Sequence, residues 1–163
     1  MPGSVPEIQD SAEIEVRAPA AVAFEVIACD LQKVVDEPDS MTGHRPADGG
    51  PMRKGFRWRQ WIVHERRRCM SEWVVTAVEP PVHLQQSMWH FCAVAKNQVT
   101  GGERWDLTEQ DDGSTLVSLR AWTRREGLTG WLEKLLGSRG GRSLSLRKRL
   151  AYVQFEAERQ AGA

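Results

Sequence analysis

The segment 140–160, close to the end of the chain, restricts the possible folds more than any other stretch. It reads GGRSLSLRKRLAYVQFEAERQ, contains no proline, and has glycine only at its start. Its apolar residues recur at the spacing of one helical face, at Leu146, Leu150, Val153 and Ala157. This pattern predicts a long amphipathic helix. Because most of the preceding chain has the patterns of strands, we expect the apolar face of the helix to pack on a sheet.

One strand and two short helices are predicted before the main group of strands. Residues 12–17 alternate between apolar and polar side chains, which is typical of a strand. Pro19 stands where proline often begins a helix, and that helix is predicted over 20–29. A second short helix is predicted over 31–36, and Pro38 ends it.

The middle of the chain predicts a meander of antiparallel strands. Residues 40–55 are rich in glycine and proline, which favours turns and a short edge strand over 41–45. Alternating patterns bounded by turn residues then predict strands over 55–65, 69–79, 83–94, 99–109 and 114–124. A short amphipathic segment, 127–136, leads into the final helix. This order predicts an α+β domain with a sheet of about six or seven strands.

The overall composition argues against several classes of function. At 163 residues the chain has the length of one domain, which we expect over 12–161 after a flexible lead-in, 1–11. The 22 basic and 22 acidic residues cancel, so we expect neither nucleic acid nor a membrane as a partner. The sequence shows no signal peptide, and its three cysteines lack CxxC spacing, which together predict a cytoplasmic location.

Motifs for cofactors and metals are missing from the sequence. The four histidines do not have the spacing of metal ligands. Neither a P-loop, a Rossmann fingerprint nor a nucleophile elbow occurs. We therefore expect no metal and no cofactor. The seven tryptophans are more than a core of this size needs, so we expect some of them to line a cavity.

Four stretches carry a resemblance to a known family. They read AEIEVRAPAAVAFEVIACDL, WVVTAVEPPVHL, RWDLTEQDDGSTLVSL and LRKRLAYVQFEAERQ. Together they resemble the START-like helix-grip (SRPBCC) superfamily, in particular its polyketide cyclase/dehydrase branch. The resemblance implies a strongly curved antiparallel sheet that grips the C-terminal helix around a hydrophobic cavity. The superfamily includes lipid carriers, aromatase/cyclases and stress-response proteins, and no catalytic set of the aromatases matches this sequence residue by residue.

Alternation along the strands predicts which side chains face the interior. In successive strands the inward sets include Trp58, Gln60 and His64, and then Trp73 and Ala77. Each tryptophan taken alone is more simply explained as core, but in this fold we expect at least one of them to contact a ligand. The predicted ligand-binding residues are Trp58, Gln60, His64, Trp73, Met88, Trp105, Leu119 and Leu150.

A histidine and a glutamate are the candidates for catalysis. A two-residue turn at 96–97 places His90 opposite Glu103, and Met88 opposite Trp105, on the inner face. A carboxylate inside an apolar cavity is costly unless it is paired, and a facing histidine lowers that cost. Such a pair could exchange protons near neutral pH. A purely structural buried pair is the more frequent arrangement of two such residues.

These features support hypotheses from different classes of protein. In the first, the protein binds a small hydrophobic molecule, polyketide-like or aromatic, and catalyses its cyclisation, aromatisation or dehydration by folding a flexible chain beside an acid/base pair. The alternative is a carrier or sensor, which needs only a cavity, apolar walls and a few polar anchors. A third hypothesis, an interaction domain of the same fold, requires an exposed apolar patch. We expect a monomer or a homodimer.

Overall fold

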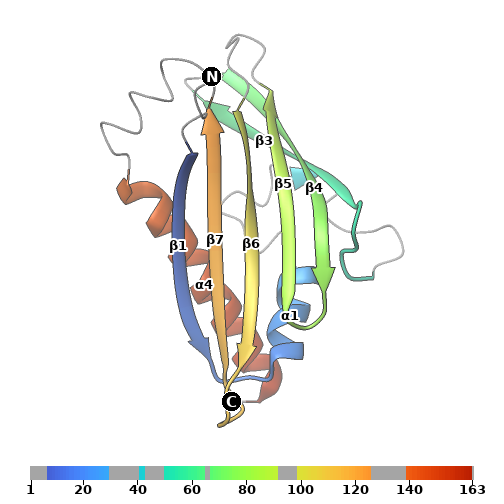
Figure 1. Ribbon diagram of the computed structural model, residues 1–163, viewed down its shortest axis with the longest axis vertical. Helices are drawn as coiled ribbons and strands as arrows, with labels where there is room; N and C mark the ends of the chain where they lie inside the picture. Colours follow the sequence, from blue (N-terminus) through green and yellow to red (C-terminus); the bar gives the residue numbers. More distant parts are fainter. Residues whose placement is uncertain are drawn as a thin grey trace, which may run out of the picture.

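A computed structural model describes residues 7–29, 41–42, 50–64, 67–91, 99–125 and 139–162 of the chain. Their elements are β1 (Glu7–Val16), α1 (Ala20–Cys29), β2 (Met41–Thr42), β3 (Arg57–His64), β4 (Arg67–Glu79), β5 (His83–Phe91), β6 (Val99–Glu109), β7 (Thr115–Arg125) and α4 (Arg139–Ala161). The described strands form one seven-stranded sheet in the order β1-β7-β6-β5-β4-β3-β2 (Figure 1). All neighbouring strands are antiparallel.

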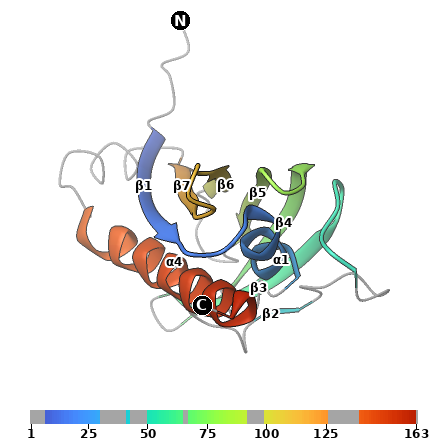
Figure 2. The same ribbon diagram turned by 90° about the horizontal axis from the view of Figure 1, so that it is seen from below.

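The sheet is curved, and both α1 and α4 lie on its concave side (Figure 2). The apolar stripe of α4 faces inward as predicted, because Leu146, Leu150, Val153 and Ala157 are all buried. Polar contacts also join the helix to the end of β1. Gln154 donates from Nε2 to the carbonyl oxygen of Glu15 at 2.7 Å. The predicted α+β architecture, with the last helix on the concave face, is therefore confirmed.

The strand boundaries differ from the prediction mainly at the N-terminus. β1 begins at Glu7, where pairing with Arg124 of β7 starts, so 7–11 belong to the sheet and not to a flexible lead-in. Of the edge strand predicted over 41–45, Met41–Thr42 form β2, and 43–45 lie outside the described residues. The predicted helix over 31–36 and the amphipathic segment 127–136 lie outside the described residues.

A bulge in β4 changes which side chains face inward. The pairing with β5 shifts between Val75 and Ala77, so Ala77 stands opposite Gln85 and Val78 stands opposite Leu84. Val78 then packs against the core. The predicted inward position of Ala77 is wrong because the inserted residue reverses the alternation beyond Val75.

The two glycines of β6 are explained by close packing within the sheet. A Cβ atom on Gly102 would lie 2.5 Å from Cζ2 of Trp122, so the indole of Trp122 occupies the space beside Gly102. A Cβ atom on Gly101 would lie 2.4 Å from the carbonyl oxygen of Trp122 and 3.3 Å from Cε of Met88. Glycine at 101 and 102 therefore allows the neighbouring strand and its tryptophan to approach β6 closely.

Candidate functional site

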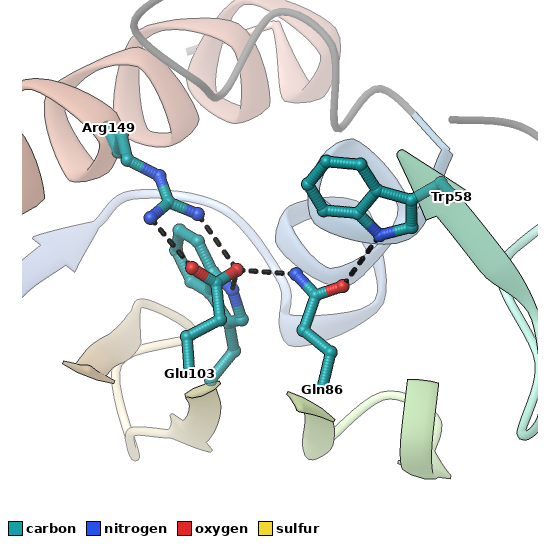
Figure 3. Close-up of polar contacts among 5 residues, drawn as sticks. Trp58, Gln86, Glu103 and Arg149 are labelled. Carbon is teal, nitrogen blue, oxygen red and sulfur yellow. Dashed lines mark hydrogen bonds and ion pairs between the residues drawn. The ribbon is translucent and has the colours of Figure 1, made fainter. Parts of the chain in front are cut away.

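A buried polar network connects α4 with three strands of the sheet (Figure 3). Arg149 donates from Nη1 to Oε2 of Glu103 at 2.7 Å and from Nη2 to Oε1 at 2.8 Å. Gln86 donates from Nε2 to Oε1 of Glu103 at 2.6 Å, and Trp105 donates from Nε1 to the same oxygen at 3.0 Å. Gln86 in turn accepts a hydrogen bond from Nε1 of Trp58 at 2.9 Å. The carboxylate of Glu103 is thus the centre of the network.

The network holds Glu103 in its charged form. Burial of the side chain raises the pKa of Glu103, because it disfavours the carboxylate. The charge of Arg149 and the hydrogen bonds from Arg149, Trp105 and Gln86 outweigh this effect, so the pKa of Glu103 lies below its ordinary value. The guanidinium of Arg149 also lies 5.3 Å from the ring centroid of Trp105. Glu103 is therefore an ionised structural partner near neutral pH and a poor proton donor.

Two tryptophans extend this network toward the β2 edge of the sheet. Trp58 and Trp73 are direct partners across β3 and β4, and their rings stack in parallel with centroids 5.1 Å apart and an interplanar angle of 1°. Trp58 is buried, whereas part of Trp73 remains exposed. Among the described residues, the buried Nε1–H of Trp73 lacks a hydrogen-bond acceptor. The pair therefore presents one covered indole and one partly exposed indole.

The concave face is packed at one end and more open at the other. The inward row Leu84, Trp105 and Leu119 is fully buried, at 0% exposure. Next to it lies the row of Gln86 and Glu103, which is also buried.

The row beyond the polar one is different. It runs from the buried Trp58 through Trp73, Met88 and Gly101 to Thr123, and Trp73, Met88 and Thr123 are each partly exposed although they face inward. The polar row thus separates a closed hydrophobic core from a more open surface.

The predicted site residues are divided between these two ends. Trp58, Trp73 and Met88 belong to the open end, and Gln60 lies beside them, paired with Ser71. Trp105, Leu119 and Leu150 belong to the closed core. His64 is the last residue of β3, and its side chain, like that of His90, lies outside the described set.

The predicted pairing of His90 with Glu103 is wrong. Gln86 stands opposite Glu103, and the partner of His90 is Val99, which is roughly 13 Å from Glu103 along β6. Met88 likewise stands opposite Gly101 and not opposite Trp105. The prediction rested on a two-residue turn at 96–97, which lies outside the described residues, and the observed register differs from the predicted one by four residues.

Sequence reasoning missed two residues of the network, Gln86 and Arg149. Gln86 lies in phase with Leu84 and Met88, so alternation already placed it on the inner face. Arg149 follows Leu146 by three residues and precedes Leu150, which puts it within the apolar stripe of α4. Both positions could have been found by asking which polar residues fall inside an otherwise apolar pattern.

Two other kinds of feature are absent from the described residues. No group of three or more histidine, cysteine, aspartate or glutamate side chains in this part of the chain could hold a metal ion. None of the helices that the structure describes is both long enough and apolar enough to cross a membrane.

Comparison with known proteins supports the fold and not a particular activity. No protein-family model matches the chain, and no curated protein sequence matches it either. A START superfamily protein from Mycobacterium smegmatis matches its structure with a TM-score of 0.55 at 14% identity, over 93% of this chain and 98% of that one. Ara h 8.0201 matches with a TM-score of 0.53 at 14% identity, over 91% and 98% of the two chains.

A third similar structure is DynU16, a putative protein in the dynemicin biosynthetic locus. It has a TM-score of 0.56 and 14% identity, and the match covers 96% of this chain and 49% of that one. Such identities support a shared fold alone. The element order, the curved antiparallel sheet and the helix on its concave side agree with these structures. The chain therefore has the START-like helix-grip fold.

Proposed function

We propose that the protein binds a small hydrophobic molecule, aromatic or polyketide-like, between α4 and the open end of the concave face. The observation that carries this proposal is the contrast between adjacent inward rows. Trp105 and Leu119 are packed to 0% exposure, whereas Trp73, Met88 and Thr123 keep accessible surface on the same face. Inward-facing apolar and aromatic surface that the protein's own core does not cover is suited to an apolar ligand.

The polar network supports the proposal by giving the site a rigid floor without net charge. Arg149 and Glu103 neutralise each other, so an apolar molecule above them meets no net charge. The side chains are 11% and 3% exposed, and the bidentate geometry restricts both. The similarity to a START superfamily protein agrees with ligand binding, although it supports only the fold.

The same network favours a carrier or sensor over an enzyme. A carboxylate that accepts three hydrogen bonds on one oxygen and a fourth on the other is poorly placed to exchange protons with a substrate. The cyclisation, aromatisation or dehydration of a polyketide-like substrate is the second candidate function, supported by the similarity to a protein in the dynemicin biosynthetic locus. In that case Glu103→Gln would abolish turnover while the protein stayed folded.

Fluorescence titration with a neutral apolar probe, 1-aminoanthracene, tests binding directly. We expect the emission of the probe to rise on mixing, and Trp73→Ala to weaken its binding by roughly tenfold, because an aromatic contact surface is lost. Trp89→Ala is the matched control, because Trp89 lies on the adjacent strand β5 and points to the outer face, at 38% exposure. Absence of binding, or equal weakening by both variants, would refute the proposal.

A further inference from the structure

Trp73 differs from the other two inward-facing tryptophans in its hydrogen bonding. Nε1 of Trp58 donates to Gln86, and Nε1 of Trp105 donates to Glu103. The Nε1–H of Trp73 is equally buried but has no acceptor within the described part of the chain. A buried donor without a partner is unfavourable, and most buried polar groups in proteins avoid that state.

A chain of contacts fixes the plane of the Trp73 ring. The amide of Gln86 has a defined orientation, because its NH2 group faces the carboxylate of Glu103 and its oxygen faces Nε1 of Trp58. This hydrogen bond restrains the indole of Trp58, and Trp73 stacks parallel to that indole. Gln86 and Trp58 are thus positioning residues for Trp73.

We propose that Trp73 selects neutral, planar, conjugated ligands that carry a carbonyl oxygen at the ring edge. This inference rests on the proposed function. Such a ligand can lie edge to edge with the partly exposed ring of Trp73, roughly in its plane, so that the carbonyl oxygen at its edge accepts the in-plane hydrogen bond from Nε1. Nε1 itself is shielded from solvent, so the ligand oxygen must displace the groups that cover it.

The charges of the site argue for a neutral ligand. Arg149 is the nearest cation of the network, but both of its Nη atoms already bond to Glu103. A carboxylate ligand would have to compete with Glu103 for them and would meet its negative charge. A ketone or quinone oxygen accepts a hydrogen bond without that repulsion. The chemical class is therefore a conjugated ketone or quinone rather than an acid.

A matched pair of probes, anthraquinone and anthracene, separates the hydrogen bond from the apolar contact. Both have three fused rings, and only anthraquinone has carbonyl oxygens. Their dissociation constants are measured by displacement of 1-aminoanthracene from the wild type and from Trp73→Phe, which keeps an aromatic ring but has no N–H. We expect the preference for anthraquinone over anthracene to fall by about threefold to tenfold in Trp73→Phe. Trp89→Phe, on the outer face, should keep the wild-type preference.

A second measurement does not depend on how well Trp73→Phe folds. In the wild type labelled with 15N-tryptophan, the Nε1–H resonance of Trp73 should move strongly when anthraquinone is added and much less with anthracene. An unchanged preference in Trp73→Phe, or a Trp73 resonance that responds equally to both probes, overturns this inference while ligand binding stands. If 1-aminoanthracene binds but anthraquinone does not displace it, this inference alone fails; if 1-aminoanthracene does not bind, the proposed function fails with it.

Discussion

Two carboxylates three residues apart on β6, Glu103 and Asp106, make similar contacts on opposite faces of the sheet. Glu103 pairs with Arg149 on the concave face, where the two side chains are 3% and 11% exposed. Asp106 accepts from Nε of Arg104 at 2.6 Å, and these side chains are 36% and 46% exposed. Asp106 also lies 2.8 Å from Nδ1 of His83. Each carboxylate pairs with an arginine, but the inner pair is bidentate and buried, whereas the outer pair has one hydrogen bond and is exposed.

The difference in burial changes what each ion pair does for the protein. Water can replace Arg104 as a partner of Asp106, so the outer pair adds little to the free energy of unfolding. Glu103 is only 3% exposed, so water replaces Arg149 poorly and the inner carboxylate depends on its partner. The inner pair also joins residues 46 positions apart, from β6 and α4, whereas the outer pair joins neighbours on one strand. The inner pair therefore fixes the helix on the sheet.

The largest effect is expected from placing a carboxylate beside this pair without a partner of its own. Leu150 is next to Arg149 on α4 and is 1% exposed. Leu150→Asp buries a charge or, after protonation, an unsatisfied polar group, at a cost of several kcal/mol against a total stability of about 5–15 kcal/mol. We expect the variant to be unfolded by circular dichroism. Cooperative melting near the parent temperature would contradict the placement of α4.

Removing the cation of each pair should lower the free energy of unfolding by different amounts on the two faces of the sheet. Arg149→Met leaves the charge of Glu103 buried and unpaired, and should lower the free energy of unfolding by about 3–5 kcal/mol. Arg104→Met, on the outer face, should lower it by about 1 kcal/mol or less. Urea denaturation of both variants under the same conditions measures the difference. Equal losses would show that burial does not distinguish the pairs.

A double variant sharpens this result. Adding Glu103→Gln to Arg149→Met removes the stranded charge but keeps a side-chain oxygen that can accept from Trp105. We expect the double variant to recover much of the stability lost in Arg149→Met, because the unpaired buried charge accounts for most of that loss. No recovery would mean that Arg149 acts mainly through packing, for example against Trp105.

Apart from the residues beyond the bulge in β4, the faces of the strands could be predicted from the sequence, but the register of β5 against β6 could not. Shifting the register by four residues, from His90 to Gln86 opposite Glu103, leaves every side chain on the same face. Hydrophobic alternation is therefore equally satisfied by both registers. No motif in the sequence distinguishes one register from the other.

The partner of Glu103 was missed for a related reason. An arginine on an amphipathic helix usually reaches water, and the apolar stripe around Leu146 and Leu150 predicts the helix whether or not Arg149 lies within it. Only the three-dimensional approach of α4 to β6 brings Arg149 to Glu103. Long-range polar pairs of this kind leave no periodic pattern in the sequence, in contrast to the core of α4, which was predicted residue by residue.

Acid should weaken the inner pair in a defined pH range. Because the pKa of Glu103 in the folded protein lies below its ordinary value of 4.5, the unfolded state binds more protons than the folded state as the pH falls through this range. The stabilisation is complete above the unfolded pKa and is lost as the pH falls through the folded pKa. We expect the stability advantage of the wild type over Glu103→Gln to be constant well above the ordinary value of 4.5 and to shrink as the pH falls through that value and below it. A constant difference across this range would contradict the ionised state of Glu103.

The smallest effect is expected from Asp106→Asn on the outer face. Burial of Asp106 raises its pKa, but hydrogen bonds from Arg104 and His83 and their charges outweigh this, so the pKa is lowered here too. Solvent nevertheless reaches both members of the Arg104 pair, and screening should keep the loss of unfolding free energy below about 1 kcal/mol. Added salt should reduce this loss further but should leave the effect of Arg149→Met nearly unchanged, because buried charges are screened much less. A salt-independent loss of about 3 kcal/mol or more for Asp106→Asn would show that the outer carboxylate is as dependent on its partners as the inner one.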